Sequence, residues 1–178
     1  MLTRVMTAFL SLTLATSGSA QGMMDDMHGD LTSVGKKFVD LARAIPEPAY
    51  SWHPTGARSV GEVLLHITGE NYLIPIFMGR AAPASVNISA GDMKTVGAFE
   101  ARKLTKDQII AELEASFTNL HQAFALTTDA NVNENMKFFG QDITRRRAVI
   151  GTVTHLHEHL GQLIAYARSN GVTPPWSR

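Results

Sequence analysis

The sequence predicts an all-α protein, a four-helix bundle with one long crossover connection between its second and third helices. Four segments place apolar residues three and four positions apart, which is the spacing of amphipathic helices, and no segment alternates as a half-buried strand would. Between the second and third of these segments, residues 81–101 are rich in Gly, Ala and Ser and only weakly patterned. Because the connection is long, the two helices that it joins need not be antiparallel neighbours.

The first 20 residues have the layout of a secretory signal peptide. Arg4 precedes an apolar run over residues 5–15, and small residues follow up to residue 20. The run is shorter than the roughly 20 apolar residues that a membrane-spanning helix needs. We therefore expect an exported protein, periplasmic or secreted, with a single domain over residues 21–178 and no stable membrane anchor.

The first two helices have recognisable ends. The apolar spacing predicts the first helix over residues 24–44, and Pro46 ends it because proline cannot continue a helix. The second helix is expected to begin at Ser59, since Ser59 and Glu62 fit a capping box in which each side chain bonds the other residue's backbone N–H. Its apolar pattern fades near Gly79.

The third and fourth helices also carry start and stop signals. Thr105 and Gln108 form a second capping signature at the start of an apolar stripe that extends to Phe124. The fourth helix follows Asp142 and ends at Gly171, with two prolines just beyond, a usual way for a helix to stop.

The composition excludes some kinds of site and partner. The chain has 16 basic and 16 acidic residues, and no segment gathers enough Lys or Arg to follow a phosphate backbone, so no nucleic-acid partner is expected. The run of arginines at residues 145–147 is interpreted as a solvated first helical turn. There is no cysteine, so any bound metal must be held by nitrogen and oxygen ligands.

The stretch HLHEHLGQ, residues 155–162, is the first candidate for chemistry. On a helix each residue advances about 100°, so His155 and His159 lie about 40° apart on one face while His157 points away. Gln162 and Tyr166 continue the same polar line, whereas most of the remaining surface of this helix is apolar. Since buried polar groups need partners, this line is either a hydrogen-bond network or a metal and substrate pocket.

The second helix supplies a counterpart to the histidine pair. His66 has aliphatic neighbours in sequence, and Glu70 lies about 40° from it around the helix. If this helix faces the fourth, His66, His155 and His159 provide three nitrogen donors, a ligand set that leaves positions open for water or substrate. Glu70 would be a fourth ligand, the carboxylate that orients a ligand, or a catalytic proton acceptor.

These segments resemble the DinB-like family of metal-binding helical bundle proteins. The resemblance rests on YSWHPTGARSVGEVLLHI, with its tryptophan-proline turn and first histidine, and on HLHEHLGQLIAYARSNGVTPP, with its His-x-x-x-His and Gly-Gln. It covers nearly all of the chain after the leader. It implies a four-helix bundle with a divalent metal on His66, His155 and His159, and a homodimer. Family members look like metal-dependent enzymes, some of which transfer low-molecular-weight thiols and others of which resemble hydrolases.

We therefore predict an exported metal-dependent enzyme, a transferase of thiol type or a hydrolase, acting on a small molecule that the sequence does not identify. The ion would be zinc, nickel or iron, with Glu70 as the catalytic base and Gln162 and Tyr166 in contact with the substrate. The alternative is a non-enzymatic metal-binding or stress-related bundle in which the same histidines have a structural role. An open site within a reachable cavity would favour the enzyme.

Overall fold

The computed structural model describes residues 22–177, so the predicted signal peptide lies outside the described part of the chain. The described chain is mostly helical, with a small two-stranded sheet. The elements are α1 (Met23–Ala44), α2 (Val60–Phe77), α3 (Met93–Glu100), α4 (Lys106–Phe124), β1 (Asn135–Phe138), β2 (Gln141–Thr144) and α5 (Arg145–Ser169). Short 3₁₀ segments cover Glu47–Ser51, Ala84–Val86 and Pro175–Ser177.

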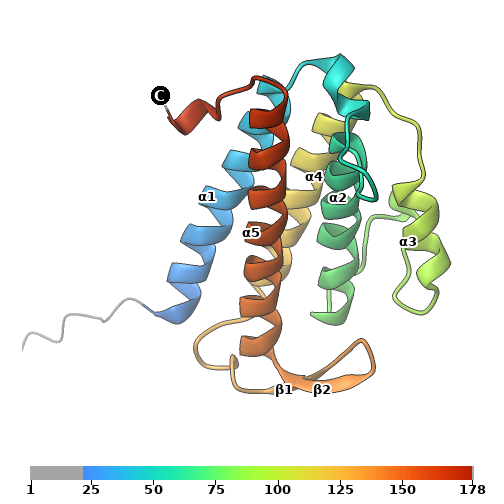
Figure 1. The fold of residues 1–178 in the computed structure, drawn as a ribbon. Coiled ribbons are helices and arrows are strands. Elements are labelled where there is room, and N and C mark those ends of the chain that lie inside the picture. The colour runs from blue at the N-terminus through green and yellow to red at the C-terminus, as the bar shows by residue number, and fades with distance from the viewer. Residues whose placement is uncertain (1–21, 178) are drawn as a thin grey trace, which may run out of the picture.

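The four long helices lie side by side (Figure 1). Helices α1 and α2 each contact both α4 and α5, so each long helix has two long-helix neighbours. The short helix α3 packs against α2 on the outside, and the antiparallel hairpin β1–β2 lies at one end, in contact with α2 and α5. This arrangement places α2 beside α5, as the predicted histidine cluster requires.

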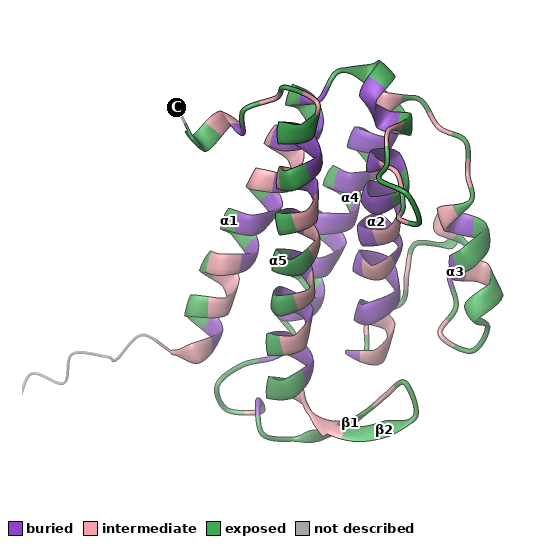
Figure 2. Cartoon of the chain, viewed as in Figure 1, coloured by how far each residue is buried: buried purple, intermediate pink, exposed green. Residues whose placement is uncertain are grey.

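The core is formed by the apolar faces of all four long helices, which turn inward (Figure 2). Phe38 on α1, Leu64 on α2, Phe124 on α4 and Leu163 on α5 are each fully buried. Burial of side chains of this size is worth about 1.5–3 kcal/mol each, which makes packing the main source of stability. Among residues 22–177, no helix combines the length and the apolar character needed to cross a membrane.

The predicted helix starts at Ser59 and Thr105 are confirmed. Both residues form complete capping boxes, Ser59 with Glu62 and Thr105 with Gln108. Helix α5 begins slightly later than expected, with Thr144 as its capping residue. It ends before Gly171, whose φ of +73° is the left-handed conformation that glycine adopts easily.

Two elements were not predicted. Residues 81–101 are a connection between α2 and α4, as expected, but they contain helix α3, whose buried residues Val96 and Phe99 pack toward α2. Residues 135–144 form the hairpin β1–β2, with Asn135 opposite Thr144 and Phe138 opposite Gln141. Both additions lie beside the histidine-bearing helices.

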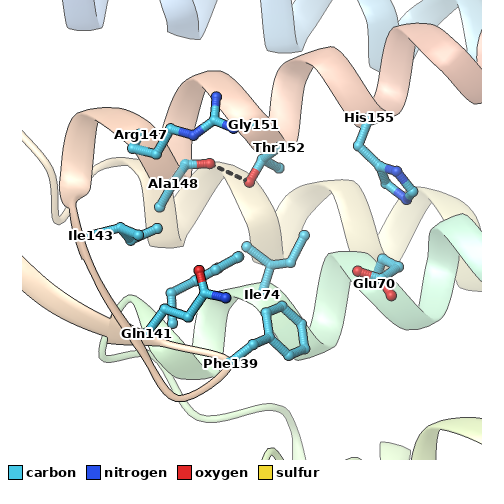
Figure 3. Close-up of a pocket in the computed structure, with 11 residues that line it drawn as sticks. Glu70, Ile74, Phe139, Gln141, Ile143, Arg147, Ala148, Gly151, Thr152 and His155 are labelled. Carbon is cyan, nitrogen blue, oxygen red and sulfur yellow. Dashed lines mark hydrogen bonds between the residues drawn. The ribbon is translucent and has the colours of Figure 1, made fainter.

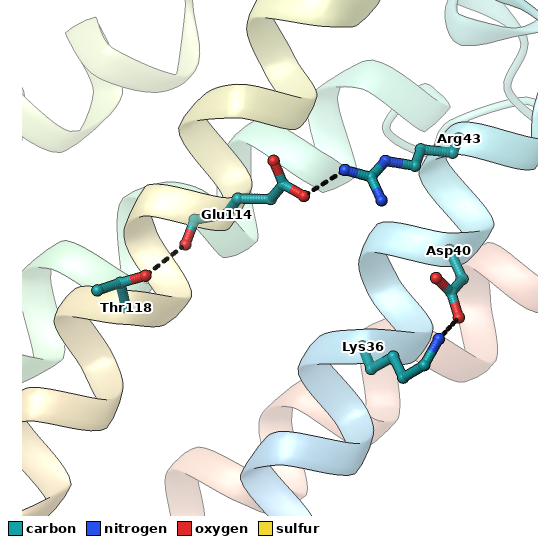
Figure 4. A network of polar contacts seen from close by, with 5 residues as sticks. All are labelled: Lys36, Asp40, Arg43, Glu114 and Thr118. Atoms are coloured by element: carbon teal, nitrogen blue, oxygen red, sulfur yellow. Dashed lines mark hydrogen bonds and ion pairs between the residues drawn. The ribbon is translucent and has the colours of Figure 1, made fainter.

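Surface ion pairs link neighbouring turns and helices at the outside of the protein (Figure 4). Arg43 on α1 bonds Glu114 on α4 at 2.5 Å, and Lys36 pairs with Asp40 one turn away. These side chains are largely exposed, and exposed pairs contribute only about 0–1 kcal/mol. They orient the surface of α1 and α4 without deciding the fold.

Candidate metal centre

Three histidine rings meet between α2 and α5. His66 comes from α2, and His155 and His159 come from successive turns of α5. One ring nitrogen from each lies within 4.8 Å of the others, and the ring centroids are 4.6–5.5 Å apart. The expected meeting of these three residues is therefore found, and together they could hold a metal ion.

His157, the third histidine of the same stretch, lies outside the cluster. Its Nε2 is 3.0 Å from Oδ1 of Asp30, on the α1 side of α5. The helical rotation of about 200° between His155 and His157 explains why one faces α2 and the other faces α1.

Two of the three rings are oriented by a hydrogen bond through Nδ1. Nδ1–H of His66 donates to Glu100 Oε1 at 2.8 Å, and Nδ1–H of His159 donates to Gln162 Oε1 at the same distance. Partners of this kind fix the tautomer of a ligating histidine and leave Nε2 as the free electron-pair donor. The hydrogen bonds of His66 and His159 would therefore suit two metal ligands, because each ring already has a supporting group.

His155 provides a direct test of whether a metal fits. Its Nε2 is buried and has no hydrogen-bond partner among the residues that the structure describes. A buried polar atom without a partner is unfavourable, and a cation shared with His66 and His159 would satisfy it. Burial, aided by the neighbouring His159, lowers the pKa of His155 to about 4, so the ring is neutral and able to ligate at pH 7. The residues present therefore fit a divalent ion.

Glu100 is the residue beside the candidate site that the sequence did not indicate. It is the last residue of α3, the helix that was not expected, and lies 34 positions from His66 in the chain. Gly69 of α2 faces α3, and a Cβ at this position would lie 3.4 Å from the Phe99 ring. The hydrogen bond from His66 lowers the pKa of Glu100, and Arg58 lies 3.6 Å from its carboxylate. Glu100 is therefore an ionised acceptor for His66.

Glu70 lies next to the cluster, one turn beyond His66. Glu70 and His155 both line one end of a pocket of about 400 Å³ between α2, α5 and the hairpin (Figure 3). Burial raises the pKa of the Glu70 carboxyl, the negative charge of Glu100 raises it further, and His66 opposes both effects. Its raised pKa and its place in the pocket make Glu70 a candidate proton acceptor.

Gln162 and Tyr166 form a chain that ends on His159. Gln162 accepts the bond from His159 and donates from Nε2 to the Tyr166 hydroxyl at 2.8 Å. Tyr166 is only 7% exposed and packs edge-on against Trp52, with ring centroids 5.2 Å apart. This geometry gives both residues a role in orienting His159, while their contact with a substrate stays a prediction.

The Glu100→Gln variant should weaken zinc binding by about 10- to 100-fold, because loss of a carboxylate partner of a ligating histidine typically costs that much affinity. The neutral amide still accepts a hydrogen bond, so the fold should be retained. Competition titration against a chromophoric zinc chelator measures the change. The matched control is Glu114→Gln, which removes an ion pair with Arg43 between α1 and α4, the two long helices that carry none of the three histidines. Equal affinity in both variants and the wild type would mean that Glu100 does not support the site.

The metal-free protein should lose stability as the pH falls from about 6.5 to about 4. The folded-state pKa of His155 is depressed from 6.5 to about 4, and that of His159 is also lowered by burial. The unfolded chain therefore binds more protons in this range, and stability decreases by at most about 1.4 kcal/mol per pH unit for each histidine. Urea unfolding in the presence of a chelator at pH 7.5, 6 and 5 measures this slope. A His155→Gln variant with an unchanged slope would contradict the assignment.

Comparison with known proteins identifies the family. A family model described as the DinB superfamily matches residues 30–163. A DinB-like protein from Bacillus cereus is similar in structure, with a TM-score of 0.70, 17% identity, and 87% of this chain and 97% of that one covered. A second, the DinB-like protein YjoA from Bacillus subtilis, has a TM-score of 0.62 and 17% identity, with 83% and 94% covered. No curated protein matches the sequence. The two solved structures share the fold, and the family model covers most of the chain, which shows that this protein belongs to the DinB superfamily.

Proposed function

We propose that this protein is a metal-dependent enzyme in which His66, His155 and His159 hold a divalent ion at the end of a substrate pocket. The observation that carries the proposal is the buried Nε2 of His155, which has no hydrogen-bond partner among residues 22–177 and belongs to a cluster whose other two rings are already oriented by Glu100 and Gln162. Three protein nitrogens leave coordination positions for water or substrate, as catalytic sites require.

Zinc, nickel or iron(II) bound there would act as a Lewis acid and lower the pKa of a water molecule or of a thiol at an open position. The protein's own contribution begins with Glu70. Its carboxylate lines the pocket beside His155, and its raised pKa brings it closer to the working pH, where a general base is most effective. Glu100 and Gln162 hold their histidine rings in place, so that the donor atoms need not reorganise during reaction.

Hydrolysis of a small substrate is the first candidate reaction, because a proton acceptor beside the cluster suits the activation of water. Thiol transfer rests on the family resemblance and is the second candidate. The two are separated by assaying the zinc-, nickel- and iron-loaded protein against p-nitrophenyl esters, and against 1-chloro-2,4-dinitrobenzene with a low-molecular-weight thiol. Ester hydrolysis that depends on the three histidines supports the first candidate, and thiol conjugation with the same dependence supports the second.

A structural role for the metal is the non-enzymatic alternative. The hydrogen bond between His66 and Glu100 joins α3 to the candidate metal position, so an ion there would also anchor α3 on α2. Full metal binding without any metal-dependent turnover of the esters or the thiol acceptor would favour this alternative and contradict the enzymatic proposal.

Three further features are proposed on the sequence and the family. The leader pattern in residues 1–20 supports export to the periplasm or beyond, which N-terminal sequencing of the protein from culture fractions tests. The pairwise contacts of α1, α2, α4 and α5 support a four-helix bundle. The family resemblance supports a homodimer, which sedimentation equilibrium tests.

A further inference from the structure

The pocket beside the histidine cluster has two chemically different ends. Figure 3 shows His155 and Glu70 at one end and Arg147, Gln141 and Ile143 at the other. Ile74 and the aromatic rings of the hairpin line the space between them. A volume of about 400 Å³ suits a small molecule, because ligand pockets usually enclose about 300–1,000 Å³.

The hairpin tip presents an aromatic ring to this pocket. Phe139 and Gly140 form the two-residue turn between β1 and β2, with φ values of +48° and +79°. Positive φ at both positions is typical of a type I′ turn, in which asparagine and glycine are preferred and a bulky residue is rare. Because a phenylalanine is strained in this conformation, we take its ring as a candidate for contact with a ligand.

The ring of Phe139 lies outside the hydrophobic core. It is 47% exposed, and its centroid is 4.5 Å from that of Phe77 and 4.8 Å from that of Phe138. Phe138 and Phe139 both line the pocket and form an aromatic wall on one side of it, with Phe77 packed against both rings. Flat apolar molecules bind such surfaces by stacking and edge contacts.

The other end of the pocket offers a cation. Arg147 lies in the first turn of α5, is exposed and lines the pocket, and its guanidinium forms no ion pair with any residue between 22 and 177. Its neighbour Arg145, by contrast, approaches Glu134 at 3.8 Å. Guanidinium groups bind carboxylate, sulfonate and phosphate groups through paired hydrogen bonds. Arg147 is therefore available to an anionic group of a ligand.

The helix sets the separation between the two ends. Arg147 and His155 are eight residues apart on α5, which corresponds to about 12 Å along the axis at 1.5 Å per residue. A ligand that contacts both Arg147 and His155 would therefore have its anionic group at one end and its reacting group at the other. One or two fused rings between these groups would match the distance.

We infer that this pocket selects small organic anions with a flat, aromatic body. The flat body of such a ligand stacks against Phe138 and Phe139, and its anionic group pairs with Arg147. The opposite end of the ligand then points toward the histidine cluster. The inference rests on the proposed function, because only a metal-dependent enzyme would act on the end of the ligand that lies near the histidines. It names the substrate class of that same site. Phe139 and Arg147 are specificity-determining residues in this arrangement.

Binding of two probes of the same shape tests the inference. Naphthalene-2-sulfonate has the anion and is a weak metal ligand, whereas 2-naphthylmethanol is neutral. Isothermal titration of the zinc-loaded protein should show tighter binding of the sulfonate.

Phe139→Asn should weaken binding of both probes by about 5- to 10-fold. Because asparagine before glycine is the preferred pair for this turn, the variant keeps the hairpin while removing the ring. Arg147→Gln should abolish the preference for the sulfonate and leave the neutral probe unaffected.

The controls are Arg146→Gln and Leu126→Ala, an exposed arginine beside Arg147 and an exposed apolar residue, neither of which lines the pocket. Both should bind the probes as the wild type does. The inference is overturned if the wild type binds neither probe, or if Phe139→Asn and Arg147→Gln bind as the controls do.

Metal content and probe binding are measured on the same samples, so that the two proposals can fail separately. Probe binding that depends on Phe139 and Arg147, in a protein that shows no metal-dependent turnover, supports the pocket and contradicts the enzymatic proposal. Metal-dependent turnover that is indifferent to both substitutions supports the enzyme and overturns the assignment of Phe139 and Arg147.

Discussion

Zinc should raise the free energy of unfolding of the metal-free protein by about 4 kcal/mol when its free concentration is 1,000 times the dissociation constant. The reason is that folding brings one ring nitrogen from each of His66, His155 and His159 to within 4.8 Å of the others. Urea unfolding followed by circular dichroism, with buffered free zinc and with a chelator, measures the difference. The stabilisation should disappear on addition of the chelator.

The control for this effect is the variant in which all three histidines are replaced by alanine. It should unfold at the same urea concentration with and without zinc. Stabilisation of this variant equal to that of the wild type would mean that zinc binds elsewhere, for example around His28 and His121, whose rings stack at 6.4 Å.

The Glu70→Gln variant should lower kcat of the metal-loaded protein by roughly 100- to 10,000-fold, which is the usual contribution of a positioned general base. The amide has nearly the same shape as the carboxyl but cannot accept a proton at neutral pH. Because Glu70 is not one of the three nitrogen donors, metal content should stay close to that of the wild type. Initial rates with the best p-nitrophenyl ester, together with metal analysis of the same preparation, measure both quantities.

The matched control is Glu62→Gln, one turn before His66 on the same helix. Glu62 is held by the backbone N–H of Ser59 in the capping box and does not line the pocket. Its substitution should leave kcat unchanged. A fall in kcat with Glu62→Gln as large as that with Glu70→Gln would show that the effect comes from helix α2 as a whole rather than from the carboxylate in the pocket.

The long helices were predictable because their signals are local and repeated. Helix α2, for instance, begins at a capping box that can be identified from Ser59 and Glu62 alone. Helix α3 has eight residues, of which only Val96 and Phe99 are buried, and two apolar positions are too few to establish a period. The hairpin strands have four residues each, and their turn has Phe139 where a typical hairpin signal would have asparagine.

The residues of the site were predictable where helical spacing relates them, and not where tertiary packing brings them together. His155 and His159 are related by helical spacing, and His66 required only that α2 and α5 be neighbours. Glu100 is brought to His66 by tertiary packing of an unexpected helix, and no local pattern connects the two residues. Arg147 was correctly placed in a first helical turn, but its proximity to a pocket depends on the hairpin that closes one side.

The metal content of the untagged protein, purified from the compartment in which it accumulates, tests the metal site most directly. Elemental analysis should find close to one divalent ion per chain in the wild type and in His157→Ala, whose histidine bonds Asp30 rather than the cluster. The variant lacking His66, His155 and His159 should contain almost none while keeping its helical circular dichroism spectrum. Absence of metal from all three proteins, with the fold intact, would contradict the metal centre and leave the three histidines as a structural network between α2 and α5.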